Sequence, residues 1–257
     1  MILEYNSAKV FYSVRGNGKP VVLIHGFLEN SSMWDNLVED LSANNQVICV
    51  DLLGHGQSDC LGYVHTMRNF SEAIQAVLNH LNITNFKVVG HSLGGYVALD
   101  LAEMNPSKTE WLCLMNSTTK PDNNERISLR NRAIKTAKTH YESLVSMSIS
   151  NLFYLDNRTT FSKEIGQLKT DALKTPVQGY IGAQEGMKLR EDKTEFFNQA
   201  RFKKMVIAGE KDPVIDFNTI KENATKSASE FVALKGGHMS QIEDLQDLKQ
   251  ALLQFIN

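Results

Sequence analysis

Cysteine is scarce in this chain of 257 residues, which contains three of them. Cys49, Cys60 and Cys113 form neither a CxxC pair nor the spacing of a metal site, and their odd number argues against a disulfide framework. Cys49 and Cys113 lie inside apolar runs, which predicts reduced and buried thiols. No other group of residues has metal-ligand spacing, so we expect neither a metal nor a cofactor.

An excess of charge of either sign is also missing. The 27 lysines and arginines nearly balance the 29 aspartates and glutamates, which gives a net charge of −2 at pH 7. This balance excludes a nucleic-acid-binding protein that works through the charge of the whole molecule. We therefore expect a small-molecule ligand and no nucleic acid.

Long hydrophobic runs are absent as well. No uncharged apolar stretch approaches the roughly 20 residues that span a bilayer, and the longest core-like run is Val21–Ile24. The first residues, Met1–Tyr5, lack the basic and long apolar regions of a signal peptide. These absences predict a cytoplasmic protein without a membrane partner.

Short apolar runs of β type recur along the chain, and most gaps between them are long enough for a crossover helix. Runs such as Val47–Val50 and Met205–Ala208 are apolar on both faces, as in a parallel sheet that helices cover on both sides. The turn residues Gly16–Gly18 follow the first run, so we expect the first strands to form an antiparallel edge. The expected strands are Lys9–Arg15, Pro20–His25, Gln46–Asp51, Phe86–Gly90, Glu110–Asn116, Phe202–Ala208 and Glu230–Leu234.

Two helical patterns are expected to cover this sheet. Gly94–Met104 is apolar nearly all round, as a central buried helix is. Gln241–Ile256 has one apolar stripe at steps of three and four, which predicts a single amphipathic helix packed on the sheet. The alternation of strands and helices predicts the α/β class with a mostly parallel central sheet.

One region interrupts this alternation, because residues 118–197 show only helical patterns. Helices inserted into such a series are most simply a cap over the carboxyl edge of the strands, where open α/β sheets bind ligands. We therefore divide the chain into a first core part at 1–117, a helical cap or lid at 118–197, and a second core part at 198–257. All three belong to one structural domain.

The sequence Gly-His-Ser-Leu-Gly-Gly at 90–95 stands directly between an apolar strand and the buried helix. A serine hydroxyl is a weak nucleophile unless a sharp strand-to-helix turn holds it exposed beside a base. Such a turn crowds the neighbours of the serine, so glycine at Gly90 and Gly94 avoids clashes that a Cβ would make. This context predicts that Ser92 is a nucleophile.

With this motif the chain resembles the α/β-hydrolase family, in its serine esterase-like branch with a helical lid. The resemblance covers everything outside the inserted helices. Its pieces stand at strand ends in the order of the family: His25–Phe27, Asp51–Ser58, the motif around Ser92, Gly209–Val214 and Gly236–His238. The resemblance implies the α/β-hydrolase fold with an inserted helical cap.

The resemblance also implies a set of site residues, since in this family the acid comes between the serine and the histidine along the chain. It assigns Ser92 as the nucleophile, Asp212 as the acid and His238 as the base. The backbone N–H groups of Phe27 and Leu93 would form the oxyanion hole.

Other residues near these motifs are expected to be structural. Asp216 is the second candidate for the acid, but its position favours a cap on the following helix. His25 is expected to shape the oxyanion loop, and His91 to pack beneath the turn that holds the serine.

These assignments imply a serine hydrolase, most simply a carboxylesterase that cleaves small or medium acyl esters or lactones through an acyl-enzyme on Ser92. Relatives use the same three residues for carbon–carbon bond hydrolysis or for a lyase step of menaquinone synthesis. Tyr96 stands where we would expect the latter branch to carry an arginine. A further alternative is a slow-turnover ligand sensor on the same fold.

The start of the cap is basic, with no acid between Arg126 and Tyr141. One interpretation is a contact with an acyl carrier protein, as in esterases that cleave carrier-bound methyl esters. Helical geometry instead favours an ordinary solvated face, because three of the basic side chains fall opposite the apolar stripe. The five residues are Arg126, Arg130, Arg132, Lys135 and Lys138, of which the last three are opposite the stripe.

Large apolar side chains of the cap are candidates for an acyl pocket, although packing between cap and core would account for most of them. The stretch Gly179–Arg190, with Gly182 and Gly186, predicts a hinge that would let the cap move. These patterns do not determine the oligomeric state. The pocket candidates are Met147, Phe153, Tyr154, Phe161, Tyr180 and Met187.

Overall fold

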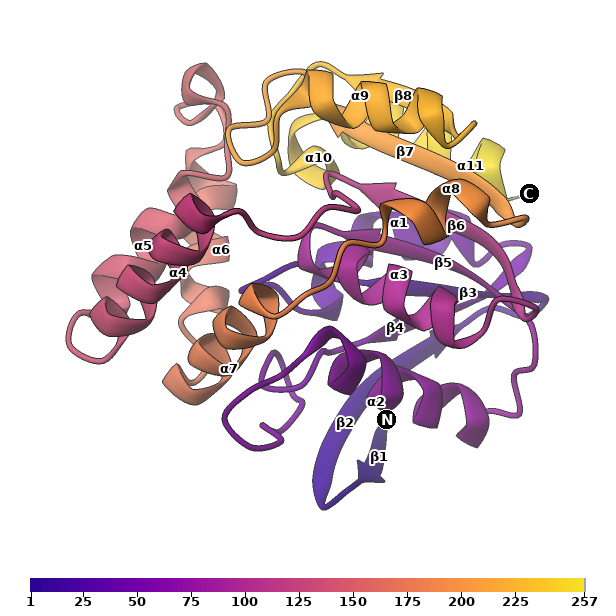
Figure 1. Ribbon diagram of the computed structural model, residues 1–257, viewed down its shortest axis with the longest axis horizontal. Helices are drawn as coiled ribbons and strands as arrows, with labels where there is room; N and C mark the ends of the chain where they lie inside the picture. The colour runs from indigo at the N-terminus through magenta and orange to yellow at the C-terminus, as the bar shows by residue number, and fades with distance from the viewer. Residues whose placement is uncertain (257) are drawn as a thin grey trace.

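The computed structural model describes residues 1–256, and its centre is an eight-stranded β-sheet (Figure 1). The strands lie in the order β1-β2-β4-β3-β5-β6-β7-β8. Neighbouring strands from β4 to β8 are parallel, whereas β1–β2 and β2–β4 are antiparallel. The bounds are β1 Ile2–Tyr5, β2 Ala8–Arg15, β3 Lys19–Ile24, β4 Asn45–Val50, β5 Phe86–His91, β6 Thr109–Met115, β7 Lys203–Gly209 and β8 Glu230–Leu234.

The strand predictions are confirmed to within one residue at each end, and the expected antiparallel edge is present. Strand β1 was not predicted, and its four residues are exposed or half-buried. The turn at Gly16–Gly18 does not close a hairpin. Strand β4 lies between β2 and β3, so β2 pairs with β4 and the chain crosses over it.

Successive residues of the inner strands face two different apolar layers, which explains why these strands have no polar face. In β3, Val22 and Ile24 belong to one buried cluster, and Val21 and Leu23 belong to the other. The first cluster includes side chains from helices α2 Met67–His80, α3 Leu93–Met104 and α9 Phe217–Lys226. The second includes side chains from α1 Asp35–Leu41 and α11 Leu245–Ile256, and Trp34 from the 3-10 helix Ser31–Trp34.

The end of the chain departs from the predicted single helix. The structure has a short helix α10 at Ser240–Glu243 and then α11, with a break at Asp244, whose φ of −138° and ψ of 37° are not helical. Asp244 accepts a hydrogen bond from the backbone N–H of Gly236 at 2.8 Å. The break therefore ties the start of the last helix to the loop that carries His238.

Between β6 and β7 the described chain contains helices and no strand. Helices α4 to α7 gather beyond one end of the sheet in Figure 1, whereas α8 lies beside the core strands. Phe197 of α8 accordingly packs in the main core cluster. The division at 118–197 stays a prediction, and we keep the name cap for these residues. The elements are α4 Asn124–Ala137, α5 Tyr141–Ser150, the 3-10 helix Leu155–Asn157, α6 Ser162–Ala172, α7 Val177–Lys188 and α8 Thr194–Gln199.

Two glycines of α7 pack closely against the loop at His65, and the predicted hinge stays a prediction. They lie within a continuous helix, and a Cβ on Gly186 would meet the carbonyl oxygen of His65 at 1.7 Å. One on Gly182 would meet the His65 ring at 2.9 Å, and the N–H of His65 donates to the carbonyl of Gly182 at 2.9 Å. Glycine is needed here for close approach between α7 and the core loop.

The buried cysteines and the lengths of the helices agree with the composition of the chain. Cys49 and Cys113 are buried free thiols, as their apolar surroundings predict, and burial raises the pKa of Cys49 to about 12. Among residues 1–256, no helix is both long enough and apolar enough to cross a membrane.

Candidate active site

Ser92 lies alone between strand β5 and helix α3, at the turn that the motif predicts. Its φ of 51° and ψ of −114° form a backbone conformation that residues with a side chain rarely adopt. A Cβ on Gly90 would meet the carbonyl oxygen of Gly94 at 2.2 Å, and one on Gly94 would meet that of Ile24 at 2.3 Å. Glycine at both positions lets the turn close and leaves Ser92 partly accessible.

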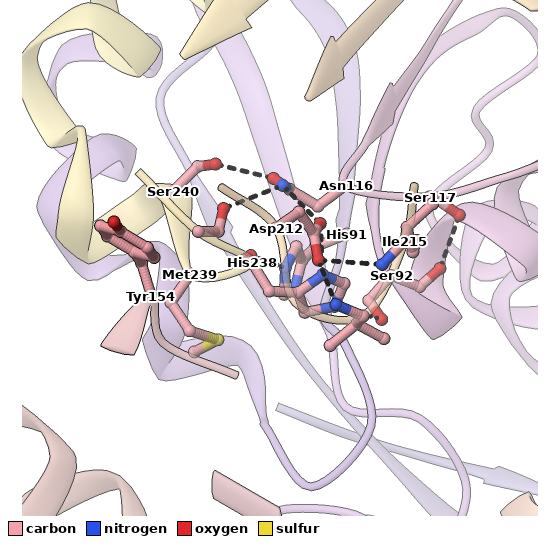
Figure 2. Close-up of polar contacts among 12 residues, drawn as sticks. His91, Ser92, Asn116, Ser117, Tyr154, Asp212, Ile215, His238, Met239 and Ser240 are labelled. Atoms are coloured by element: carbon pink, nitrogen blue, oxygen red, sulfur yellow. Dashed lines mark hydrogen bonds and ion pairs between the residues drawn. The ribbon is translucent and has the colours of Figure 1, made fainter. Parts of the chain in front are cut away.

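The structure brings the three predicted side chains into one hydrogen-bonded chain (Figure 2). His238 Nδ1 lies 2.7 Å from Asp212 Oδ2, and its Nε2 lies 2.9 Å from Ser92 Oγ. An ionised Asp212 only accepts hydrogen bonds, so Nδ1–H donates to it. Nε2 is then the acceptor, and the hydroxyl of Ser92 donates to it. The hydroxyl proton of Ser92 therefore points toward His238 Nε2.

Asp212 is held by groups that favour its ionised form. Burial by itself would raise the pKa of this carboxyl, but His238, the backbone N–H of Val214 and Asn116 outweigh burial and lower it. Oδ1 accepts the N–H groups of Val214 and Ile215 at 2.7 and 3.0 Å. The competing carboxylate, Asp216, accepts the N–H of Thr219 at 2.8 Å and caps α9, as its position predicts.

Asn116 is a member of this site that the sequence did not reveal. Its Nδ2 donates to Asp212 Oδ2 at 3.1 Å and to the carbonyl of Gly237 at 3.2 Å, and its Oδ1 accepts the hydroxyl of Ser240 at 2.7 Å (Figure 2). It therefore joins the loop of the acid to the loop of the histidine. The available signal was its position directly after β6, beside the strands that lead to Ser92 and Asp212.

The two amides predicted to form an oxyanion hole belong to residues beside the cavity and at the start of α3. Leu93 is the first residue of α3, where backbone N–H groups have no partner within the helix and carry partial positive charge. Phe27 lines the cavity that Ser92 also lines. Within residues 1–256, no hydrogen bond from the N–H of Phe27 or Leu93 is present. Both N–H groups are therefore free to donate a hydrogen bond to a bound oxygen atom.

A buried ion pair lies directly behind the site, between Glu29 and His91. Glu29 Oε2 accepts His91 Nδ1 at 2.7 Å and the N–H of Gly26 at 2.7 Å, and Gln241 donates to Oε1 at 2.8 Å. The other nitrogen of His91 faces the carbonyl of His238 at 3.0 Å. Because both nitrogens of His91 face acceptors, the imidazolium form fits this site.

The pKa values of this pair shift in the directions that the geometry requires. Burial works against the charge of each partner, but their mutual attraction and hydrogen bond raise the pKa of His91 and lower that of Glu29. His91 packs beneath the turn as expected, and Glu29 is a partner that the sequence did not reveal. Together they link the oxyanion loop, the serine turn and the histidine loop.

Two further histidines serve as neutral structural groups. His25 accepts the N–H of Leu52 through Nε2 at 2.9 Å and its Nδ1 lies 2.7 Å from the carbonyl of Gly26, which confirms its structural role. Burial lowers the pKa of His25, and burial lowers that of the neighbouring His55 to about 3. These rings shape the loop that carries the amide of Phe27.

A cavity of about 110 Å³ opens beside Ser92 and His238. Of the six apolar candidates from the cap, Met187 lines it. Phe153 instead packs with Phe161 in a separate buried cluster, and Met147 is 58% exposed. The helix pattern identified apolar residues but not which of them face the serine. The apolar and aromatic lining consists of Phe27, Leu28, Tyr96, Ile149, Leu152, Met187 and Val214.

Within residues 1–256, no group of three or more histidine, cysteine, aspartate or glutamate side chains is arranged to hold a metal ion.

A family model described as alpha/beta hydrolase fold matches residues 19–245. The chain belongs to this family. The α/β-hydrolase fold expected from the motifs is confirmed.

Several relatives of this α/β-hydrolase have been described. The structure of a thermophilic esterase from Thermogutta terrifontis, with malate bound, has a TM-score of 0.92 and 25% identity and covers 97% of this chain and 93% of its own. The 3-oxoadipate enol-lactonase 1 of Acinetobacter baylyi is 26% identical over 251 residues, which are 93% of this chain and 89% of that protein. An uncharacterized protein of Mycobacterium tuberculosis is 35% identical over 106 residues, which are 41% of this chain and only 31% of that relative's length.

The five basic residues at the start of the cap of this α/β-hydrolase, on α4 and its C-cap residue Lys138, divide into two groups. Arg132, Lys135 and Lys138 are exposed, as helical geometry predicts. Arg126 and Arg130 turn inward and line the cavity beside Ser92. Contact with an acyl carrier protein stays a prediction, and it would involve the exposed group.

Proposed function

We propose that this chain is a serine hydrolase of the carboxylesterase type, which cleaves small or medium acyl esters or lactones through an acyl-enzyme on Ser92. The observation that carries the proposal is the hydrogen-bonded chain from Ser92 through His238 to Asp212 at the edge of a cavity. This arrangement supplies a nucleophile, a base and a group that orients the base.

In the first step the hydroxyl oxygen of Ser92 attacks the ester carbonyl while His238 Nε2 takes its proton. Asp212 keeps the proton of His238 on Nδ1 and stabilises the imidazolium as it forms. His238 then gives the proton to the leaving alcohol, and the acyl group stays on Ser92. A water molecule, activated by the same nitrogen, releases the acid and restores the serine.

The tetrahedral intermediate carries a negative oxygen that needs fixed donors. The amides of Phe27 and Leu93 fill this role in the proposal, since both are without a partner and the second stands at a helix N-terminus. Loss of one such donor typically costs about 2.7–4 kcal/mol of transition-state stabilisation. The Glu29–His91 pair supports this function by fixing the loop through Gly26.

Two named relatives support an ester-type bond as the target. The Acinetobacter protein is named an enol-lactonase and matches along nearly the whole chain, and the Thermogutta protein is named an esterase. A lactone is a cyclic ester, so one acyl-enzyme mechanism serves both names.

The proposal is tested by hydrolysis of 4-nitrophenyl acetate and butyrate by the wild-type chain and by Ser92→Ala. We expect the variant to lose at least about 10³-fold in kcat. Ser128→Ala, at an exposed serine on α4, is the matched control and should retain wild-type rates. Hydrolysis that survives in Ser92→Ala would overturn the assignment of this site.

The alternatives give different results in the same study. A carbon–carbon hydrolase would cleave a diketone substrate faster than any of the esters. A slow ligand sensor would complete a single acylation and then stall, and ligand would change hydrogen exchange in the cap. The proposed esterase turns over repeatedly on esters of graded acyl length.

A further inference from the structure

Three arginines surround one buried aspartate in the cap. The side chain of Asp122 is fully buried, and it pairs with Arg190 at 2.7 Å, with Arg126 at 3.7 Å and, most closely, with Arg130. Burial would raise the pKa of Asp122, but Arg130 and Arg190 outweigh it and lower the pKa, so the carboxylate is ionised. One carboxylate cannot balance three guanidinium groups, so the cluster is positive overall.

Two of these arginines, Arg126 and Arg130, line the cavity that Ser92 and His238 line. They are one helical turn apart on α4 and therefore present the same face. Their side chains are 37% and 12% exposed, so both are partly withdrawn from water. The positive charge of the cluster therefore extends to the site of the proposed chemistry.

Both guanidinium groups retain donors for a ligand. Arg126 Nη1 donates to the carbonyl of Val214 at 3.0 Å, and Arg130 Nη1 donates to Gln184 Oε1 at 2.9 Å. A guanidinium has five N–H donors, and the contacts with Asp122, Val214 and Gln184 use only part of the ten. These contacts also hold the two planar groups in position.

The anionic groups near the cavity are already paired. Glu29 lines the same cavity but is paired with the imidazolium of His91, and Asp212 does not line the cavity. They therefore do little to cancel the charge of Arg126 and Arg130. The surrounding apolar side chains, such as Ile149 and Leu152, lower the local polarity and strengthen any contact between opposite charges.

We infer that Arg126 and Arg130 form a carboxylate subsite, and that the preferred substrates are esters whose acyl part ends in a carboxylate. This inference rests on the proposed function and specifies its substrate class. The acyl part stays on Ser92 after the alcohol leaves, so it is the part that the cavity must hold. Arginine binds carboxylates through paired, charge-assisted hydrogen bonds, which gives direction as well as affinity.

The test compares two esters with the same chain length and leaving group, mono-4-nitrophenyl adipate and 4-nitrophenyl hexanoate. The first carries a terminal carboxylate and the second does not. In the wild-type chain we expect kcat/KM to be at least about tenfold higher for the adipate monoester, the size expected of a charge-assisted hydrogen bond. Equal values, or a preference for the hexanoate, would overturn the inference.

The variant Arg126→Gln removes one charge and leaves Asp122 with Arg130 and Arg190. We expect it to reduce the preference for the adipate monoester about tenfold. Arg132→Gln, on the exposed face of the same helix, is the matched control and should keep the wild-type preference. A preference that is unchanged in Arg126→Gln would contradict the assignment even if the wild-type chain favours the charged ester.

A binding measurement separates this inference from the proposed function. Hydrolysis of the hexanoate that depends on Ser92 tests the function alone. If neither ester is hydrolysed, the function fails, and titration calorimetry with adipate still decides the subsite. Adipate binding that Arg126→Gln weakens about tenfold and Arg132→Gln does not would support the subsite, and no binding would overturn it.

Discussion

The two sides of the cavity are held together by different interactions. On the sheet side, Ser92, Asp212 and His238 stand at the ends of β5, β7 and β8, and short hydrogen bonds join them to one another and to the backbone. On the cap side, the long side chains of Arg126 and Arg130 reach across a buried aspartate. Because the three side chains follow strands of one sheet, we expect changes of charge in the cap to leave their positions unchanged.

The largest expected effect is on the sheet side. In Asp212→Asn the amide cannot keep the proton of His238 on Nδ1, so the wrong tautomer is favoured. By analogy with the same change in a well-studied serine protease, kcat on 4-nitrophenyl butyrate should fall about 10⁴-fold. Circular dichroism should be unchanged, and a loss below about tenfold would contradict the role of Asp212.

On the cap side, Asp122→Ala should affect stability more than the chemistry of the sheet side. Removal of one partner from a buried ionic cluster typically costs about 3–5 kcal/mol, here because Arg126, Arg130 and Arg190 would repel one another. Hydrogen exchange should accelerate in α4 and α7, with β5 and α3 still protected. Equal loss of protection in the cap helices and in β5 and α3 would show that the cap does not open separately from the core.

The Glu29–His91 pair gives a smaller effect with a defined pH dependence. Glu29→Gln should lower the free energy of unfolding by about 2 kcal/mol, because it removes the anionic partner of a buried imidazolium. The lowered pKa of Glu29 adds stability above its usual value of 4.5, and this is lost as the pH falls through the folded value. The raised pKa of His91 adds stability below its usual value of 6.5, and this is lost as the pH rises through the folded value.

The difference between the wild type and Glu29→Gln should therefore be largest between these two usual values, pH 4.5 and 6.5, and shrink on either side. Denaturant unfolding of both proteins across this range measures it. A difference that does not vary with pH would show that the pair is not ionised in the folded protein.

The smallest effect is expected on the exposed face of α4. Replacement of Arg132, Lys135 and Lys138 by glutamine should change stability by no more than about 0.5 kcal/mol per residue, since all three are exposed. Rates on both the adipate and hexanoate esters should stay within twofold of wild type. A loss of adipate preference in this triple variant would mean that general charge on the cap, and not the inward pair, selects the substrate.

Local sequence was sufficient where local geometry controls the outcome. The strands were predicted because runs of successive apolar residues indicate strands with an apolar layer on each side. Ser92 was predicted because its turn closes only with glycine at the flanking positions of the motif. The break at Asp244 was missed because its cause, a bond to Gly236, lies outside the helical pattern. Similarly, the close approach of Gly182 and Gly186 to His65 was not predicted, because His65 is distant along the chain.

The sequence by itself determined the order of strands and helices, the family resemblance, and the positions of Ser92, Asp212 and His238 at strand ends. The tertiary structure alone decided that Asn116 joins Asp212 to the loop of His238. It also decided that Glu29 contacts His91 and stabilises its imidazolium form. It also decided that Arg126 and Arg130 face the cavity. The reason is physical: helical and strand periods define faces, but which group meets a face depends on contacts between residues far apart along the chain.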